Sequence, residues 1–276
     1  MNIKPDCLVC LMNQTLKVSN LLKLDDKTSK KLLDNTAQLL IEHNLDHTPP
    51  QIAKSIYSMI SEITGEDDPL ALAKEEATRL ALSVDTNFVQ TLQDAVKLAL
   101  IGNVIDFGAQ KQFDLNEMIQ EHFHRSFGIN DLNKFEHELK DAKELVYIGD
   151  NVGEHIFDKL LIEMIKKDYP DLTIYYFVRG KPIINDVTLK EAQILKDCAH
   201  IIDTGAQTPG YDLSEVNAES RVIFDRADVV LAKGMGNFES LYLTVQRPVY
   251  FLFIVKCNVV AQAIGEKEQA LIFKKG

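Results

Sequence analysis

The chain has 276 residues, of which 46% are hydrophobic, and its 30 basic and 41 acidic residues give a formal charge of −11. This hydrophobic content is sufficient for the packed core of a folded globular protein with one large or two smaller domains. Because the basic residues are scattered in singles and pairs, no positive stripe is available for a phosphate backbone, and nucleic acid is not expected as a partner.

The sequence carries no recognisable membrane or secretion signal. The longest apolar run, residues 249–255, is much shorter than the roughly 20 residues of a membrane-spanning helix. The first ten residues, MNIKPDCLVC, lack the apolar core of a signal peptide. The four cysteines are too unevenly spread for a disulfide framework. We therefore expect a cytoplasmic protein with reduced thiols and no membrane partner.

From the start to about residue 140 the apolar residues recur at helical spacing. The clearest case is the segment 48–65, in which Thr48 can cap the helix, Pro49 suits its first turn and Gly65 can end it. This pattern predicts a helix over this segment.

Two further helices are indicated in the same half of the chain. Asp68 precedes a proline, which repeats the start signal of the preceding helix. The segment 85–102 places five apolar residues on one helical face: Phe88, Leu92, Ala95, Val96 and Ala99. We predict a helical bundle for this half of the chain.

After residue 140, short apolar runs alternate with segments of helical spacing. The runs are almost continuously apolar and rich in β-branched and aromatic residues, as expected for strands covered on both faces. They occupy residues 145–148, 173–178, 200–203, 228–232 and 249–255. The helical segments between them occupy residues 154–167, 188–197 and 214–227.

This alternation predicts an α/β fold, in which an N-terminal helical bundle packs on a doubly wound, mostly parallel α/β/α sandwich. We place a helical domain at residues 1–140 and a Rossmann-like α/β domain with the metal site at residues 141–276. The polar stretch 130–144 between them has a helical composition. The two halves are therefore expected to pack together, without a flexible linker.

Polar residues follow the predicted strands, at the edge where ligands bind in sheets of this kind. Asp150 and Asn151 follow the first strand, and Asp186 lies in the loop after the second. Two carboxylates and an amide oxygen form an all-oxygen set that suits a hard cation. We predict that these three residues hold a divalent metal, Mg²⁺ or Mn²⁺, with Co²⁺ and Ni²⁺ as further candidates.

Two lysines follow later strands and complete a set that fits a phosphate group. Lys233 and Lys256 would lie near the two acids and the metal, and phosphate oxygens need a cation and ammonium donors together. Gly234 and Gly236, ahead of a helix, can present backbone N–H groups to the same anion.

Each of these features also has a purely structural explanation. An Asp–Asn pair after a strand is ordinary turn and helix-cap chemistry, and Asn185 with Asp186 can cap the next helix in the same way. The set is more informative than its members, because five successive strand ends carry polar or charged groups where caps alone need only one each.

Six short motifs span nearly the whole chain. They are PDCLVC at 5–10 with Gln14, GNVIDFG at 102–108, GDNVGE at 149–154, NDVT at 185–188, KGMGNFESL at 233–241 and VKC at 255–257. In kind and in order they resemble those of the metal-dependent damage-control phosphatases, and in particular the archaeal and bacterial branch with an N-terminal Cys-x-x-Cys. The resemblance implies the same two-part fold and a divalent metal on Asp150, Asn151 and Asp186.

The resemblance also implies an enzyme that hydrolyses phosphate monoesters of small metabolites such as sugar phosphates. The implied catalytic residues are Asp150, Asp186 and Lys233. The implied substrate-binding residues are Glu154, Asn103, Asp106, Asn237 and Lys256. In eukaryotic relatives the last motif is Arg-Thr-x-Lys, and here only Lys256 matches it. The nucleophile is either a metal-bound water or the carboxylate of Asp150, and both alternatives stay open.

Two other classes of protein are weighed against the phosphatase. A methyltransferase using S-adenosylmethionine would bind its cofactor at the turn after the first strand, but GDNVGE lacks the G-x-G-x-x-G spacing that suits a dinucleotide. A non-catalytic protein that binds a metal or another ligand is the second alternative. The oligomeric state and the natural substrate are not predicted.

Cys7 and Cys10 form a Cys-x-x-Cys pair that could bind zinc. A structural zinc site needs four ligands, and no second pair of suitable spacing exists in the sequence. We therefore expect buried or redox-active thiols, with zinc as the alternative.

Overall fold

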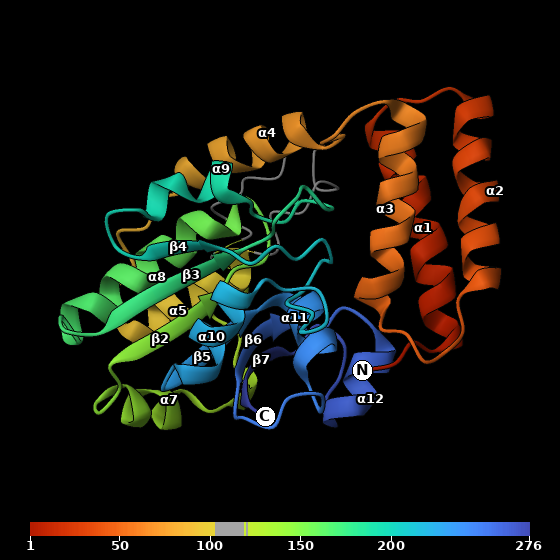
Figure 1. Ribbon diagram of the computed structural model, residues 1–276. Helices are drawn as coiled ribbons and strands as arrows, with labels where there is room; N and C mark the ends of the chain where they lie inside the picture. Colours follow the sequence, from red (N-terminus) through yellow and green to blue (C-terminus); the bar gives the residue numbers. More distant parts are fainter. Residues whose placement is uncertain (103–118, 120) are drawn as a thin grey trace.

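Three helices at the start of the chain form a separate bundle beside the sheet (Figure 1). The computed structural model describes residues 1–102, 119 and 121–276. The bundle helices are α1 (Pro5–Leu21), α2 (Asp26–Glu42) and α3 (Pro49–Thr64). Their apolar faces enclose a core of their own, which includes Leu11, Leu32 and Ile56.

Helix α3 begins and ends where its sequence signals predict. The side chain of Thr48 accepts a hydrogen bond from the backbone N–H of Gln51, and the Gln51 side chain accepts one from the N–H of Thr48. This reciprocal cap satisfies two of the N–H groups that the first turn leaves without helical partners. Pro49 occupies the first turn, and Gly65 follows the last residue in a left-handed conformation.

The next two helices leave the bundle and approach the sheet. They are α4 (Ala71–Leu82) and α5 (Leu92–Ile101). Helix α5 starts later than predicted because the side chain of Thr91 caps it by accepting from the N–H of Asp94. Phe88, which was expected on the helix face, lies before the helix but packs against the same core.

Seven strands form one sheet within the described part of the chain, in the order β1-β7-β6-β5-β2-β3-β4. The strands are β1 (Phe127–Asn130), β2 (Glu144–Ile148), β3 (Thr173–Val178), β4 (His200–Asp203), β5 (Val229–Lys233), β6 (Tyr250–Ile254) and β7 (Leu271–Lys275). All neighbouring pairs are parallel except β6 and β7. The five predicted strands and the mostly parallel α/β class are confirmed, whereas β1 and β7 were not predicted.

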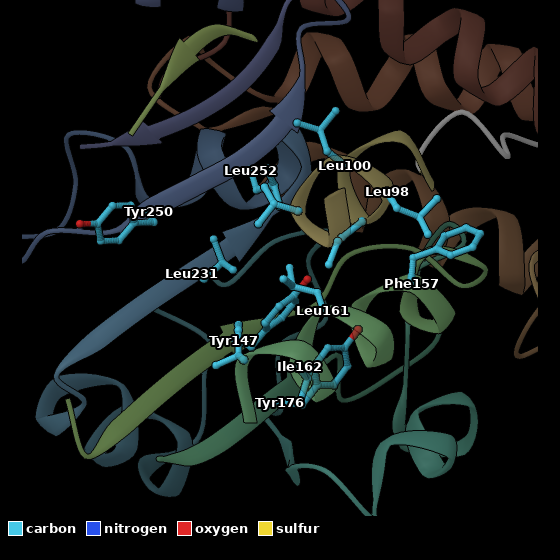
Figure 2. Close-up of a cluster of buried hydrophobic side chains, with 14 of the residues drawn as sticks. Leu98, Leu100, Tyr147, Phe157, Leu161, Ile162, Tyr176, Leu231, Tyr250 and Leu252 are labelled. Carbon is cyan, nitrogen blue, oxygen red and sulfur yellow. The ribbon is translucent and has the colours of Figure 1, made fainter. Parts of the chain in front are cut away.

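Helices cover both faces of this sheet. One face carries α5, α7 (Leu132–Leu139), α8 (Glu154–Asp168) and α9 (Leu189–Ala192), which a 3₁₀ turn continues over Gln193–Leu195. The other carries α10 (Ala218–Arg226), α11 (Gly234–Leu241) and α12 (Asn258–Ile264). Figure 2 shows α5 and α8 side chains meeting those of the strands, among them Leu98, Leu161, Tyr147, Tyr176 and Leu252.

The two faces explain the continuous apolar runs in the sequence. In β2, Leu145 and Tyr147 enter the core beneath α5 and α8, and Val146 and Ile148 enter the core beneath α10 and α11. A strand that alternates between two buried faces has no polar side, as the sequence of each central strand predicts.

The bundle rests against the edge of the sandwich. Helix α3 lies beside α11, Gln51 donates to the Asp212 carboxylate at 2.7 Å, and Lys54 pairs with Glu215 at 2.7 Å. Because β1 and α7 join the sheet layer, residues before 141 contribute to the sandwich, and the domain boundary at 140/141 stays a prediction. Within the described ranges, no helix combines the length and apolarity needed to cross a bilayer.

We expect Thr48→Ala to lower the free energy of unfolding by about 1 kcal/mol, because the cap of α3 loses its side-chain acceptor. Urea unfolding followed by circular dichroism measures the change. Ser58→Ala, an exposed substitution inside the same helix, should leave stability unchanged or slightly higher. Equal loss in both variants would show that the cap does not stabilise the bundle.

Candidate metal and phosphate site

The site lies where the order of the strands reverses. From β2 the chain proceeds outward through β3 to β4, and from β5 it proceeds in the opposite direction to β6. Ligands of open α/β sheets bind beyond the carboxyl ends of the strands at such a switch point. Here Asp150 follows β2, and Gly234 follows β5, its neighbour in the sheet.

Backbone hydrogen bonds bring the loops after β2 and β3 together. The N–H of Val187 donates to the carbonyl of Asp150 at 2.9 Å, and the N–H of Val152 donates to that of Asn185 at 2.8 Å. Asn151 and Asp186 face each other in an isolated antiparallel bridge. The three predicted metal ligands, Asp150, Asn151 and Asp186, therefore converge on one edge of the sheet.

The loop that carries Asp186 holds a strained residue. Ile184 has a φ of +47°, a conformation that is rare for β-branched side chains. Ile183 and Ile184 pack into the core of the α1–α3 bundle, and this packing holds the strained backbone in place.

The carboxylate of Asp150 touches the backbone of the turn after β5. Gly234 has a φ of +78°, and a Cβ atom at this position would lie 1.9 Å from Asp150 Oδ2. Only glycine allows the acid to approach the start of α11 so closely. The first of the two glycines that the sequence placed at the phosphate site is thus required for the position of Asp150.

Arg179, which sequence reasoning missed, links the two acids. Its Nε donates to Asp186 Oδ2 at 2.7 Å, and its Nη2 lies 4.0 Å from Asp150 Oδ1. The arginine is 1% exposed and follows β3 directly, as the acids follow their strands. Its position directly after a predicted strand was a signal in the sequence that could have identified Arg179 as a site residue.

Lys233 is enclosed behind the predicted metal ligands. Its Nζ donates to Asp158 Oδ1 at 2.8 Å and to Glu154 Oε2 at 3.1 Å, and all three side chains are buried. Burial alone would lower the pKa of Lys233, but Asp158 and Glu154 outweigh it and raise the pKa above the ordinary value. Lys233 is therefore a fixed cation whose contacts are with these acids.

Asn237 lies beneath the site and ties several strand ends together. Its Nδ2 donates to the carbonyl oxygens of Lys233 at 2.7 Å and Gly149 at 3.1 Å. Its Oδ1 accepts from the N–H of Tyr211 at 2.8 Å and from Arg179 at 3.3 Å. Since the residue is fully buried, it can act on a substrate only through the groups that it holds.

Lys256 is the exposed cation of the site. It follows β6, and its charge counteracts the rise in the pKa of Asp150. Asn103 and Asp106, which the resemblance places near the substrate, lie outside the described residues.

The buried cluster carries more negative than positive charge. Hydrogen bonds and ion pairs connect four carboxylates (Asp150, Glu154, Asp158 and Asp186) with two cations (Arg179 and Lys233). Fully ionised, this set has a charge of −2, which a divalent cation would balance. The carboxylate and amide oxygens of Asp150, Asn151 and Asp186 are also the ligand type that hard divalent ions prefer.

The pKa values of the acids in the cluster reflect the same excess of negative charge. Burial, and next the nearby Asp186, raise the pKa of Asp150 to about 7. Burial raises the pKa of Glu154 to about 7 against the opposing effect of Lys233, and that of Asp186 to about 6 against the effect of Arg179. Perturbed acids gathered at a strand edge are characteristic of functional sites.

The N-terminal cysteines are separate from this cluster. Cys7 is buried and Cys10 is exposed on the first turns of α1. Among the described side chains, no group of three or more His, Cys, Asp and Glu residues is arranged to hold a metal. Within that part of the chain, the two thiols have no further ligands of these types for zinc.

Comparisons with known proteins agree along nearly the whole chain. Residues 3–272 match the damage-control phosphatase ARMT1-like domain. A damage-control phosphatase of Pyrococcus horikoshii is 33% identical over 280 residues, which cover 99% of this chain and 97% of that protein. A damage-control phosphatase of Archaeoglobus fulgidus is 32% identical over 281 residues, with 96% of each chain covered.

The fold agrees as well. The crystal structure of a DUF89 family protein from Pyrococcus horikoshii matches this structure with a TM-score of 0.90 and 32% identity. The match covers 100% of this chain and 99% of the other. The complete α/β sandwich with its helical bundle is thus shared.

We expect Gly234→Ala to weaken Mn²⁺ binding by roughly 100-fold or more, because the added methyl group displaces the Asp150 carboxylate. Gly265→Ala is the matched control, since Gly265 has a φ of +73° and open space around it. Both variants should lose about 1 kcal/mol from the left-handed backbone, but only the first should lose metal affinity. Titration calorimetry measures binding, and equal affinity in the two variants would contradict the contact.

In metal-free protein we expect the melting temperature to fall between about pH 5 and about pH 8. Folding raises the pKa of Asp150 to about 7 and that of Asp186 to about 6, so the folded state holds protons that the unfolded state releases. The stability gained from these protons is lost as the pH rises through the folded-state values. Thermal unfolding of chelator-treated protein measures the slope.

Two substitutions test the origin of this slope. Asp150→Asn should flatten it, whereas Asp171→Asn, at an exposed turn, should leave it unchanged. A melting temperature that rises over the interval would show that the buried acids are ionised throughout.

Proposed function

Since this chain belongs to the damage-control phosphatases with an ARMT1-like domain, we propose that it hydrolyses phosphate monoesters of small metabolites, such as sugar phosphates, with a divalent metal at the sheet edge. The observation that supports the metal is the cluster of four buried carboxylates and two buried cations around the ends of β2, β3 and β5. The family assignment favours this reaction over a methyltransferase or a non-catalytic binding protein.

In this proposal Asp150, Asn151 and Asp186 hold the metal. When bound, the metal supplies Lewis acidity toward the phosphoryl oxygens. Mg²⁺ and Mn²⁺ are the ions that an all-oxygen set favours, and Co²⁺ and Ni²⁺ are further candidates. Arg179 fixes Asp186 through a buried ion pair and leaves the second oxygen of that carboxylate for the metal.

The phosphate group would lie between the metal ligands and the start of α11. Lys256 is exposed at this edge and can donate to phosphoryl oxygens, and the N-terminus of α11 is the positive end of its helix dipole. Such charges stabilise a reaction most where they oppose the charge that develops in the transition state. Direct contact of Lys233 with the phosphate stays a prediction. In the structure Lys233 Nζ donates to Glu154 and Asp158 instead.

The organic part of the substrate would extend toward the helical half. Helix α3 lies beside α11, and Gln51 contacts Asp212 across the junction of the two halves. We propose that side chains at this junction determine which metabolites are accepted.

Phosphate release from p-nitrophenyl phosphate and a panel of sugar phosphates tests the proposal. Chelator-treated protein should be inactive, and Mg²⁺, Mn²⁺, Co²⁺ or Ni²⁺ should restore activity. Asp186→Asn should lower the restored kcat/KM by roughly 100-fold or more because a metal ligand is lost. The exposed Asp171→Asn is the control and should retain full activity.

Two outcomes would contradict the proposal. Hydrolysis that persists without metal would show that the reaction does not need a metal. Full activity of Asp186→Asn would show that the active site lies elsewhere. A covalent aspartyl phosphate trapped at Asp150 would identify its carboxylate as the nucleophile, and its absence in single-turnover reactions would favour water.

A further inference from the structure

We infer that Glu154, Lys233 and Asp158 are positioning residues that fix the Asn151 amide so that its carbonyl oxygen faces the metal. The inference rests on the proposed function, because it concerns a ligand of the proposed metal. It assigns a role to Asp158, and it gives Glu154 and Lys233 a task other than direct contact with substrate.

The two ends of the Asn151 amide are chemically different. Only Oδ1 can bind a cation, whereas Nδ2 carries two N–H donors. In the structure Nδ2 donates to Glu154 Oε1 at 2.7 Å and to Asp150 Oδ2 at 2.9 Å, so both donors have acceptors. In the reversed orientation Oδ1 would face two carboxylates without a donor between them. Glu154 and Asp150 together therefore select the orientation in which Oδ1 points away from their two accepting oxygens.

Glu154 can do this only if its carboxylate is held in place. Its second oxygen, Oε2, accepts from Lys233 Nζ at 3.1 Å, and Lys233 in turn donates to Asp158 Oδ1 at 2.8 Å. The two acids are four residues apart on α8, a spacing that puts them on one helical face, toward the end of β5. Glu154, Lys233 and Asp158 are each at most 1% exposed.

The far end of this chain of contacts is anchored in the sheet. The hydroxyl groups of Tyr147 and Tyr176 donate to Asp158 at 2.6 Å and 2.8 Å. The two tyrosines are paired across β2 and β3, their rings lie 5.4 Å apart, and both enter the core shown in Figure 2. The contacts thus run without a gap from the core of the sandwich to Asn151.

Such a network is not explained by stability alone. Burying charged side chains costs several kcal/mol per ion, and well-packed apolar residues in place of a buried ion pair are often equally or more stable. The network ends on a residue of the metal site, and outer groups that orient metal ligands commonly affect affinity. Orientation of Asn151 accounts both for the burial of these charged side chains and for the position of the network beside a proposed metal ligand.

Mn²⁺ binding by titration calorimetry tests the inference without reliance on turnover. Glu154→Gln should weaken Mn²⁺ binding by roughly 10- to 100-fold, because the neutral amide accepts from Asn151 Nδ2 less strongly and leaves Asp150 as the one carboxylate that holds this orientation. Asp158→Asn, one contact further away, should weaken binding by a smaller factor, and it serves as the second variant if Glu154→Gln does not fold.

The sharpest control changes the symmetry of the ligand. Asn151→Asp introduces a carboxylate whose two ends are equivalent, so orientation no longer matters, and Glu154 then only repels it. In this background Glu154→Gln should strengthen Mn²⁺ binding, the opposite of its effect in the native protein. A merely structural role of Glu154 would give the same sign in both backgrounds and would overturn the inference.

The absorption spectrum of bound Co²⁺ provides a second readout. Glu154→Gln should change the d–d bands, because the ligand set changes, and the exposed Asp171→Asn should not. Failure of the native protein to bind any divalent ion would refute the proposed function itself. Normal metal binding by Glu154→Gln, with metal bound by the native protein, would refute only the inference.

Discussion

The excess of buried negative charge around Asp150 is the constraint on which the rest of the site depends. Carboxylates that lose their water need partners, and here Arg179 and Lys233 are the buried partners that the structure supplies to four acids. Burial, and next the nearby Asp186, raise the pKa of Asp150 to about 7, although Arg179 and Lys233 oppose the rise. A further cation would balance the ionised site, and its binding would then compete with protonation for the same oxygens.

The fold places these charged side chains at the ends of β2 and β5, where the strand order reverses. The reversal of strand order between β2 and β5 separates the helices that follow them, so that the space between the two strand ends can admit side chains from both. On one side Gly234 lets the Asp150 carboxylate reach the backbone, and on the other α8 supplies two acids from a single face. The apolar residues of α5 and α8 exclude water from the inner end of the network (Figure 2).

Much of this architecture was predictable because central strands and covering helices have strong patterns. Strands β2 to β6 and the convergence of Asp150, Asn151 and Asp186 follow from apolar runs and from the geometry of parallel sheets. The edge strand β1 and its neighbour β7 did not: FGIN at Phe127–Asn130 is partly exposed and has no continuous apolar run, and the apolar run of β7 ends after three buried residues at two lysines. Such strands form because a neighbouring strand offers hydrogen-bond partners, which the local sequence does not show.

The site residues that were not predicted were missed for a different reason, because their roles depend on contacts that form only in the folded protein. Arg179 resembles a surface turn residue in sequence, and its role depends on a contact with Asp186 seven positions away. Asp158 interrupts the apolar face of α8 four residues after Glu154, a signal that could have identified it. The motif marked Asn237, but only the assembled strand ends reveal that it is enclosed beneath them.

The strained loop before Asp186 links the two halves of the molecule. Ile183 and Ile184 belong to the core of the α1–α3 bundle, whereas Asp186 belongs to the edge of the sheet. A shift in the bundle core would therefore reach Asp186, the proposed metal ligand, through a few peptide units. As related proteins diversify toward new metabolites, the surface of the bundle is free to change, but the part of its interior that holds these two isoleucines must evolve together with the proposed metal site.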